Sequence, residues 1–186
     1  AVTNVREPGV APGSRSRGQL TRDFLIGAME PAAYAASVPA AEFSGFNLLV
    51  ADAETLYYCS NRDGAPRALQ PGIYGVSNHL LDTPWPKLSS AKEGFRRALS
   101  AVPDETAFFD LLADDEIAPD VDLPATGVPL EWERRLSAVF VRSPDYGTRA
   151  STVLMRHRDG SGVLIERSFG AEPGATGEVR LAFGRR

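Results

Sequence analysis

The stretch YGVSNHLLDTPWPK, residues 74–87, gathers side chains that could take part in binding or chemistry. Asn78 stands where an expected short strand ends, and its amide group can donate and accept hydrogen bonds there. His79 follows, and Trp85 is held between two prolines, which makes its ring a rigid apolar surface. From the residues alone, three alternatives stay open. Asparagine is a favoured turn residue, the histidine can be structural rather than a base, and the tryptophan can be a packing anchor rather than a pocket wall.

Residue counts limit the chemistry that the chain can support. Its single cysteine, Cys59, excludes an intrachain disulfide, and its two histidines, His79 and His157, show no spacing with cysteine that is typical of a metal site. We therefore expect no metal and no cofactor. Cys59 follows two tyrosines in an apolar run, which predicts a small, buried side chain.

Charge and hydropathy narrow the choice of partners. The formal net charge is −4 without an extended basic face, which argues against binding to nucleic acid. The sequence has no run of about 18 apolar residues, so we expect no membrane span. We expect a small-molecule ligand or substrate as the partner and the cytoplasm as the location, and the sequence leaves the oligomeric state open.

Apolar periodicity predicts a mixed chain of helices and strands that forms a single domain over residues 1–186. An amphipathic helix carrying Leu20, Phe24, Leu25 and Ala28, capped by Ser14 or Ser16, precedes a short helix opened by Pro31. Further helices are expected at residues 88–102, 104–112 and 130–136, and strands at residues 46–51, 56–60, 72–77, 138–142, 148–156, 162–168 and 178–183. This order is typical of an α+β domain in which helices cover antiparallel sheets.

Several blocks of the sequence together resemble the transport and Golgi organisation family, also called the NRDE protein family. The blocks are, in order, SRGQLTRDFL, GFNLLVAD, LYYCSNRDGAP, LQPGIYGVSNHLLDTPWPK, LLADDEIAPD, LPATGVPLEWERRLSAVFV and YGTRASTVL. The resemblance runs nearly end to end, from Ala1 to Phe183. The blocks YGVSNHLLDTPWPK and EWERRLSAVFV are long enough to be specific.

The resemblance implies a fold like that of the N-terminal-nucleophile hydrolases, a four-layer αββα sandwich of antiparallel sheets. Complete members carry a cysteine after the initiator methionine and an Asn-Arg-Asp-Glu block on an early strand, and the resemblance places both ahead of Ala1. We therefore expect residues 1–186 to be the C-terminal part of a longer NRDE-type domain, with the first strands missing from this chain. The triplet Asn61-Arg62-Asp63 continues with Gly64 instead of glutamate, and we expect a turn there.

Enzymes of this fold attack an amide or ester carbonyl with their first residue and stabilise the resulting oxyanion with hydrogen-bond donors. Resemblance to the bile-salt and penicillin V acylases implies catalytic roles for Asn4, Asn78 and Arg149. Ligand-binding roles are considered for His79, Trp85 and Arg149. Asn4 as a turn residue and Arg149 as a surface ion-pair residue stay open as alternatives.

Two functions follow from the resemblance. The first is hydrolysis of an amide or ester bond in the complete protein. Cys59 cannot supply an N-terminal nucleophile, because its nitrogen is in a peptide bond. The alternative is a non-enzymatic trafficking or carrier protein for haem or lipid-like ligands, in which Arg149 would pair with a carboxylate of the ligand.

Overall fold

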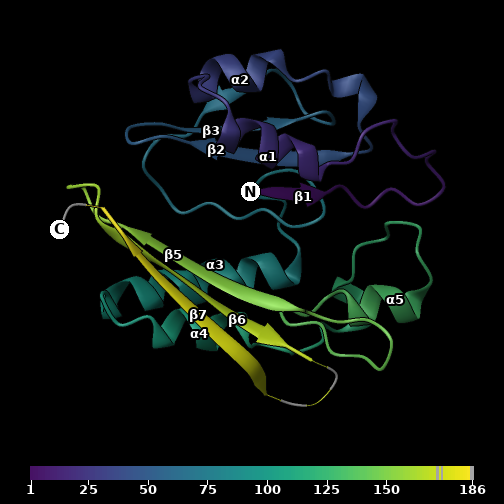
Figure 1. The fold of residues 1–186 in the computed structure, drawn as a ribbon. Helices are drawn as coiled ribbons and strands as arrows, with labels where there is room; N and C mark the ends of the chain where they lie inside the picture. Colours follow the sequence, from purple (N-terminus) through teal and green to yellow (C-terminus); the bar gives the residue numbers. More distant parts are fainter. Residues whose placement is uncertain (171, 173, 185–186) are drawn as a thin grey trace. The chain divides into compact units, whose positions relative to one another are not determined.

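The computed structural model describes residues 1–170, 172 and 174–184. Its contacts group the chain into two compact units (Figure 1). Unit 1 comprises Ala1–Pro84 and Ala125–Val128, and unit 2 comprises Trp85–Pro124 and Pro129–Arg186. Each unit contains one antiparallel sheet, so the mixed α and β composition expected from the sequence is confirmed. The assignment to a single domain stays a prediction.

Unit 1 is built on a four-stranded antiparallel sheet in the order β1-β2-β3-β4. The strands are β1 (Val2–Asn4), β2 (Phe46–Ala51), β3 (Leu56–Ser60) and β4 (Arg67–Ala68). The β2–β3 hairpin has the bounds that the sequence predicts. Its turn is closed by the carboxylate of Asp52, which accepts hydrogen bonds from the N–H groups of Glu54 and Thr55 at 2.8 and 2.7 Å.

Helices α1 (Gly18–Ile26) and α2 (Pro31–Ser37) pack against one face of this sheet. The core that they form with the sheet consists of Leu20, Ala35, Phe43, Phe46, Leu48, Val50 and Cys59. The apolar face of α1 is narrower than predicted, because Leu20 is buried whereas Leu25 is 78% exposed. The predicted cap by Ser14 or Ser16 is wrong, since Arg17 is the N-cap residue and its side chain makes no capping bond.

Unit 2 is built on a three-stranded antiparallel sheet in the order β5-β6-β7. Its strands are β5 (Ala150–Arg156), β6 (Gly162–Phe169) and β7 (Ala175–Phe183). Helices α3 (Pro86–Ala98) and α4 (Thr106–Leu112) lie behind the sheet in Figure 1. Together with the sheet they bury a core of Ala98, Phe108, Phe109, Val153 and Ile165. A further short helix, α5 (Leu130–Arg135), and the 3₁₀ turns η1 (Ala40–Glu42, in unit 1), η2 (Leu99–Ala101) and η3 (Asp120–Asp122) complete the elements of the described residues.

Two predicted strands are absent from the described structure. Residues 138–142 form no strand, although Ala138 and Phe140 are buried. The N–H of Phe140 donates to the carbonyl of Asp114 at 2.7 Å, and the N–H of Val141 donates to the hydroxyl of Thr148 at 3.0 Å. These loop partners take the place of a strand ladder. Residues 72–77 also form no strand, and the carbonyl of Ser77 bonds instead to the side chain of Thr3.

The two antiparallel sheets are the confirmed part of the predicted fold, and the four-layer αββα sandwich stays a prediction. None of the helices in the described ranges is long and apolar enough to cross a membrane.

Candidate functional site

A buried polar network lies on the face of the unit 1 sheet that points away from α1 and α2. Side chains alternate between the two faces of a strand, so Asn47 and Tyr58 lie opposite the apolar positions of β2 and β3, and both are 1% exposed. The hydroxyl of Tyr58 donates to Oδ1 of Asn47 at 2.7 Å. Nδ2 of Asn47 donates to the hydroxyl of Thr3 at 3.1 Å and to the carbonyl of His79 at 2.8 Å.

This network holds the segment around Asn78 in place. The hydroxyl of Thr3 donates to the carbonyl of Ser77 at 2.7 Å, and the N–H of Leu81 donates to the hydroxyl of Tyr58 at 3.2 Å. Buried backbone groups require partners, and here side chains supply them instead of a neighbouring strand. The predicted strand at residues 72–77 is therefore wrong, and Asn78 lies in an irregular segment rather than at a strand end.

Asn78 is joined to the end of β1 by two hydrogen bonds. Its Nδ2 donates to the carbonyl of Asn4 at 3.2 Å, and its own carbonyl accepts the N–H of Arg6 at 2.7 Å. The structure thus brings Asn4 and Asn78 together, but through the main chain of Asn4. Asn4 is exposed. An amide NH₂ has two N–H donors, and the bond to Asn4 uses one of those of Asn78.

His79 is tied to the turn that follows it. Its Nδ1 lies 2.8 Å from the hydroxyl oxygen of Thr83, and that hydroxyl donates to the carbonyl of Leu80 at 2.9 Å. Because a hydroxyl has one hydrogen, which this one gives to Leu80, Nδ1 is the donor of the bond to Thr83. The imidazole is exposed, and its observed bond fits the structural role more closely than that of a base.

Trp85 and Arg149 belong to unit 2. Trp85 is half-buried and precedes α3, where its carbonyl accepts the N–H groups of Leu88 and Ser89 at 2.9 and 3.0 Å. It thereby begins the helix, and it is not among the described residues that line the cavity beside Arg149.

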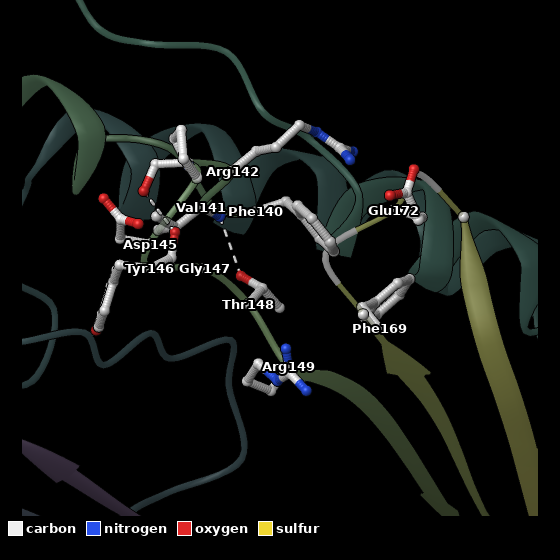
Figure 2. Close-up of a pocket in the computed structure, with 14 residues that line it drawn as sticks. Phe140, Val141, Arg142, Asp145, Tyr146, Gly147, Thr148, Arg149, Phe169 and Glu172 are labelled. Atoms are coloured by element: carbon white, nitrogen blue, oxygen red, sulfur yellow. Dashed lines mark hydrogen bonds between the residues drawn. The ribbon is translucent and has the colours of Figure 1, made fainter.

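Arg149 immediately precedes β5 and lines a cavity of about 150 Å³ (Figure 2). Phe140 and Phe169 form one wall, with ring centroids 4.8 Å apart and planes nearly perpendicular. Tyr146 and Arg142 also line the cavity. Pockets for whole organic ligands usually measure about 300–1,000 Å³, so this cavity is smaller than most, and the carboxylates of Asp145 and Glu172 line it beside the two arginines.

The predicted site residues therefore fall into two sets. Asn4, Asn78 and His79 lie together in unit 1, whereas Trp85 and Arg149 lie in unit 2. A joint site of the asparagines and Arg149 stays a prediction.

Sequence reasoning missed Asn47 and Tyr58, which position the segment that carries Asn78. The available signal was Asn47 itself, a polar residue inside the apolar run FNLLVA. Burial raises the pKa of the Tyr58 phenol, so the group remains a neutral donor at physiological pH.

Cys59 is buried, as predicted, and its Sγ lies 3.7 Å from the carbonyl oxygen of Ala35. Burial raises the pKa of this thiol, which disfavours the reactive thiolate. Across residues 1–170, 172 and 174–184, no three His, Cys, Asp or Glu side chains are grouped so that they could hold a metal ion.

Comparison with known proteins confirms the resemblance seen in the sequence. Residues 1–171 match the model of the family described as Transport and Golgi organisation 2. The Transport and Golgi organization protein 2 homolog of Bos taurus is 37% identical over 193 aligned positions, which cover 93% of this chain and 69% of that protein. The mouse homolog (Mus musculus) and the human homolog (Homo sapiens) are each 34% identical, over 91% of this chain and 67% of the relative.

Proposed function

Because the chain belongs to the Transport and Golgi organisation 2 family, we propose that it is the C-terminal part of a longer domain that hydrolyses an amide or ester bond. One observation carries the proposal: an asparagine amide, that of Asn78, is fixed at the end of β1 by a bond to Asn4 and by the buried network behind it. Fixed donors of this kind stabilise the oxyanion of acyl transfer better than mobile ones, because they need no reorganisation.

In this proposal the second N–H of Asn78 donates to the oxyanion, and the exposed amide of Asn4 is a further donor. The proposed nucleophile is the N-terminal cysteine that the family resemblance places ahead of residue 1. Cys59 is not a candidate, because its thiol is buried. Arg149 pairs with an acidic group of the substrate. The αββα arrangement of the two sheets and a cytoplasmic location belong to the same proposal.

The test compares two asparagines of unit 1 in the natural polypeptide. Asn78→Ala is expected to lower kcat for acyl p-nitroanilides or p-nitrophenyl esters about 10²–10³-fold. It should lower the free energy of unfolding by about 1 kcal/mol or less, because it removes one exposed hydrogen bond. Asn61→Ala is the matched control, since within the described residues its amide bonds to the main chain of Phe46, Ala40 and Phe43, away from the segment around Asn78.

The control should lose stability while each folded molecule keeps its activity. Equal kcat values for Asn78→Ala and the parent protein would contradict the role of Asn78. Absence of hydrolysis in the parent protein, over a panel of acyl amides and esters, would contradict the proposed function.

A second function is favoured by the cavity beside Arg149. A cation next to Phe140 and Phe169 suits the carboxylate end of an apolar ligand, as a carrier of haem or lipid-like molecules would require. A carrier would bind haem or a fatty acid without turnover. Arg149→Gln should then weaken binding at least about 10-fold, whereas Arg142→Gln, which changes the other arginine of the same cavity, should weaken it less.

A further inference from the structure

The outer face of α5 carries exposed aromatic and apolar side chains that hydrolysis does not require. Trp132 lies on α5 (Figure 1), and its ring contacts that of Tyr146 edge to face, with centroids 5.6 Å apart. Both rings are exposed, as is Leu130 at the start of α5, and Val121 in η3 is 91% exposed. We call these four residues the α5 face. Tryptophan and tyrosine are enriched among the side chains that dominate the binding energy of protein interfaces.

Hydrogen bonds and an ion pair fix the segments that form the α5 face. Nε and Nη2 of Arg134 donate to the two carboxylate oxygens of Asp120 at 2.8 and 2.6 Å. This pair holds Val121, the next residue, beside α5. The hydroxyl of Ser143 donates to the carbonyl of Tyr146 at 2.6 Å and closes the turn that carries the second ring. A surface that is ordered before binding loses less entropy when a partner binds.

Negative charge is concentrated around the α5 face. Residues 114–122 and α5 together hold seven carboxyl groups and two arginines, a net charge of −5. The full chain has a net charge of −4, so all other residues together carry +1. Both arginines already pair with carboxylates, whereas within the described residues the exposed Glu116 and Asp122 make no ion pair. Uncompensated carboxylates therefore lie next to exposed aromatic rings.

We propose that the α5 face binds a basic segment of another protein, in which lysine or arginine side chains flank at least one apolar side chain. The apolar side chain packs on the rings of Trp132 and Tyr146, and the cations pair with the surrounding carboxylates. A cation of the segment can also lie over a ring, as the guanidinium of Arg135 lies 5.7 Å from the ring centroid of Trp132. The inference goes beyond hydrolysis and does not depend on it.

Other occupants fit this charge less well. A second copy in a two-fold dimer would bring its own negative α5 face against this one, and like charges repel. The phosphates of nucleic acids and the anionic lipids of membrane surfaces would be repelled in the same way. A basic segment without an apolar side chain would leave the two rings exposed to water, which is unfavourable.

The test uses the natural polypeptide and three labelled peptides of equal length. The first, Lys-Lys-Leu-Phe-Lys-Lys, has both features, the second has glutamate in place of lysine, and the third has glycine in place of leucine and phenylalanine. Fluorescence anisotropy should show that the first binds at least about 10-fold more tightly than the others. The indole N–H resonance of Trp132 should shift on binding, whereas that of Trp85, which begins α3, should not. Equal binding of the second or third peptide, or no shift at Trp132, would overturn the inference.

Charge reversal distinguishes the α5 face from the net charge of the whole protein. Asp122→Lys should weaken binding of the first peptide at least about 3-fold. It should leave Tm unchanged, because this carboxylate makes no ion pair within the described residues. Glu54→Lys is the matched control, since it changes the net charge equally and lies in an exposed turn of unit 1. Equal weakening in the two variants would show a nonspecific effect of charge and overturn the inference.

Trp132→Ala tests the apolar contact and should weaken binding of the first peptide at least about 10-fold. If this variant does not fold, Tyr146→Ala, which removes the second exposed ring, decides the question. Full affinity in a folded variant would overturn the inference. A dimer that either variant dissociates, measured by sedimentation, would identify a second copy as the occupant and overturn it as well. A polypeptide that binds the peptide but hydrolyses no amide or ester contradicts only the hydrolase, and the reverse result contradicts only the α5 face.

Discussion

Asn61 and Asn78 show how the surroundings of one amide group decide its role. Oδ1 of Asn61 accepts the N–H of Phe46 at 2.9 Å, and its Nδ2 donates to the carbonyls of Ala40 and Phe43 at 3.1 and 3.0 Å. Both ends of the Asn61 amide are thus in use, and the triplet Asn61-Arg62-Asp63 lies in the turn that the sequence predicts. Asn78 commits one N–H, to Asn4, and keeps the capacity for a second bond.

The hydroxyl of Tyr58 is predicted to stabilise unit 1. Tyr58→Phe would remove the partner of Asn47 Oδ1 and of the N–H of Leu81. Leaving buried polar groups without partners costs about 1–3 kcal/mol, and urea unfolding should show a loss of that size. Tyr57→Phe is the control, because the ring of Tyr57 packs toward the helix-side core. Equal losses in the two variants would contradict the importance of the network.

At the level of elements, sequence reasoning succeeded where strands carry their own apolar pattern. The hairpin of β2 and β3 is set by two apolar runs and a turn that Asp52 closes, all within 15 residues of sequence from Phe46 to Ser60. Residues 72–77 carry a similar local pattern, but the carbonyl of Ser77 bonds to the side chain of Thr3, distant in sequence, and the N–H and C=O of Gly75 bond to Asp82. No local pattern contains that information, so the position of Asn78 could be predicted only approximately.

The ion pair between Glu7 and Arg62 is predicted to make the stability of unit 1 depend on pH. Oε2 and Oε1 of Glu7 accept from Nε and Nη2 of Arg62 at 2.7 and 2.8 Å, and Oε1 also accepts the N–H of Gly45 at 2.9 Å. The hydrogen bond from Arg62 is the main cause that lowers the pKa of Glu7. A carboxyl group whose pKa is lowered on folding stabilises the folded protein at pH values above the usual pKa of that group. This contribution is lost as the pH falls through the lowered pKa.

Glu7→Gln should therefore reduce the free energy of unfolding by about 1 kcal/mol or less at neutral pH, since the pair is partly exposed. The difference between the variant and the parent should shrink as the pH falls below the usual range of glutamate. Urea unfolding at several pH values measures it, and a difference that grows toward acid pH would contradict the assignment.

Gly162 is predicted to be required by the sheet of unit 2. A Cβ at this position would overlap the carbonyl oxygen of Met155 and lie 2.5 Å from Cζ of Phe183, so neighbouring strands on both sides would be forced apart. Gly162→Ala should destabilise unit 2 by about 1–3 kcal/mol. Gly177→Ala on β7 meets no atom within 4 Å and should be neutral or stabilising by up to about 1 kcal/mol. Thermal unfolding of the two variants compares them, and equal Tm values would contradict this interpretation.

At the scale of the whole molecule, the family could be predicted from the sequence because long blocks such as YGVSNHLLDTPWPK carry it. The two antiparallel sheets could be predicted as well. The roles of the predicted site residues could not be predicted in the same way, because Asn78 and Arg149 belong to different units and no local pattern relates them. The roles of Asn78 and Arg149 therefore remain proposals. The burial of Cys59 removes this residue from the candidate nucleophiles.

The most direct test of the hydrolase is the mass of the natural polypeptide during turnover of an activated acyl ester. Attack by a nucleophilic side chain releases the alcohol and leaves one acyl group on the protein, which water then removes. We predict a transient mass increase of one acyl group, located by peptide mapping at the N-terminal residue and reduced in Asn78→Ala. Stable mass with no release of alcohol, or an acyl group found only on surface lysines, would contradict the account.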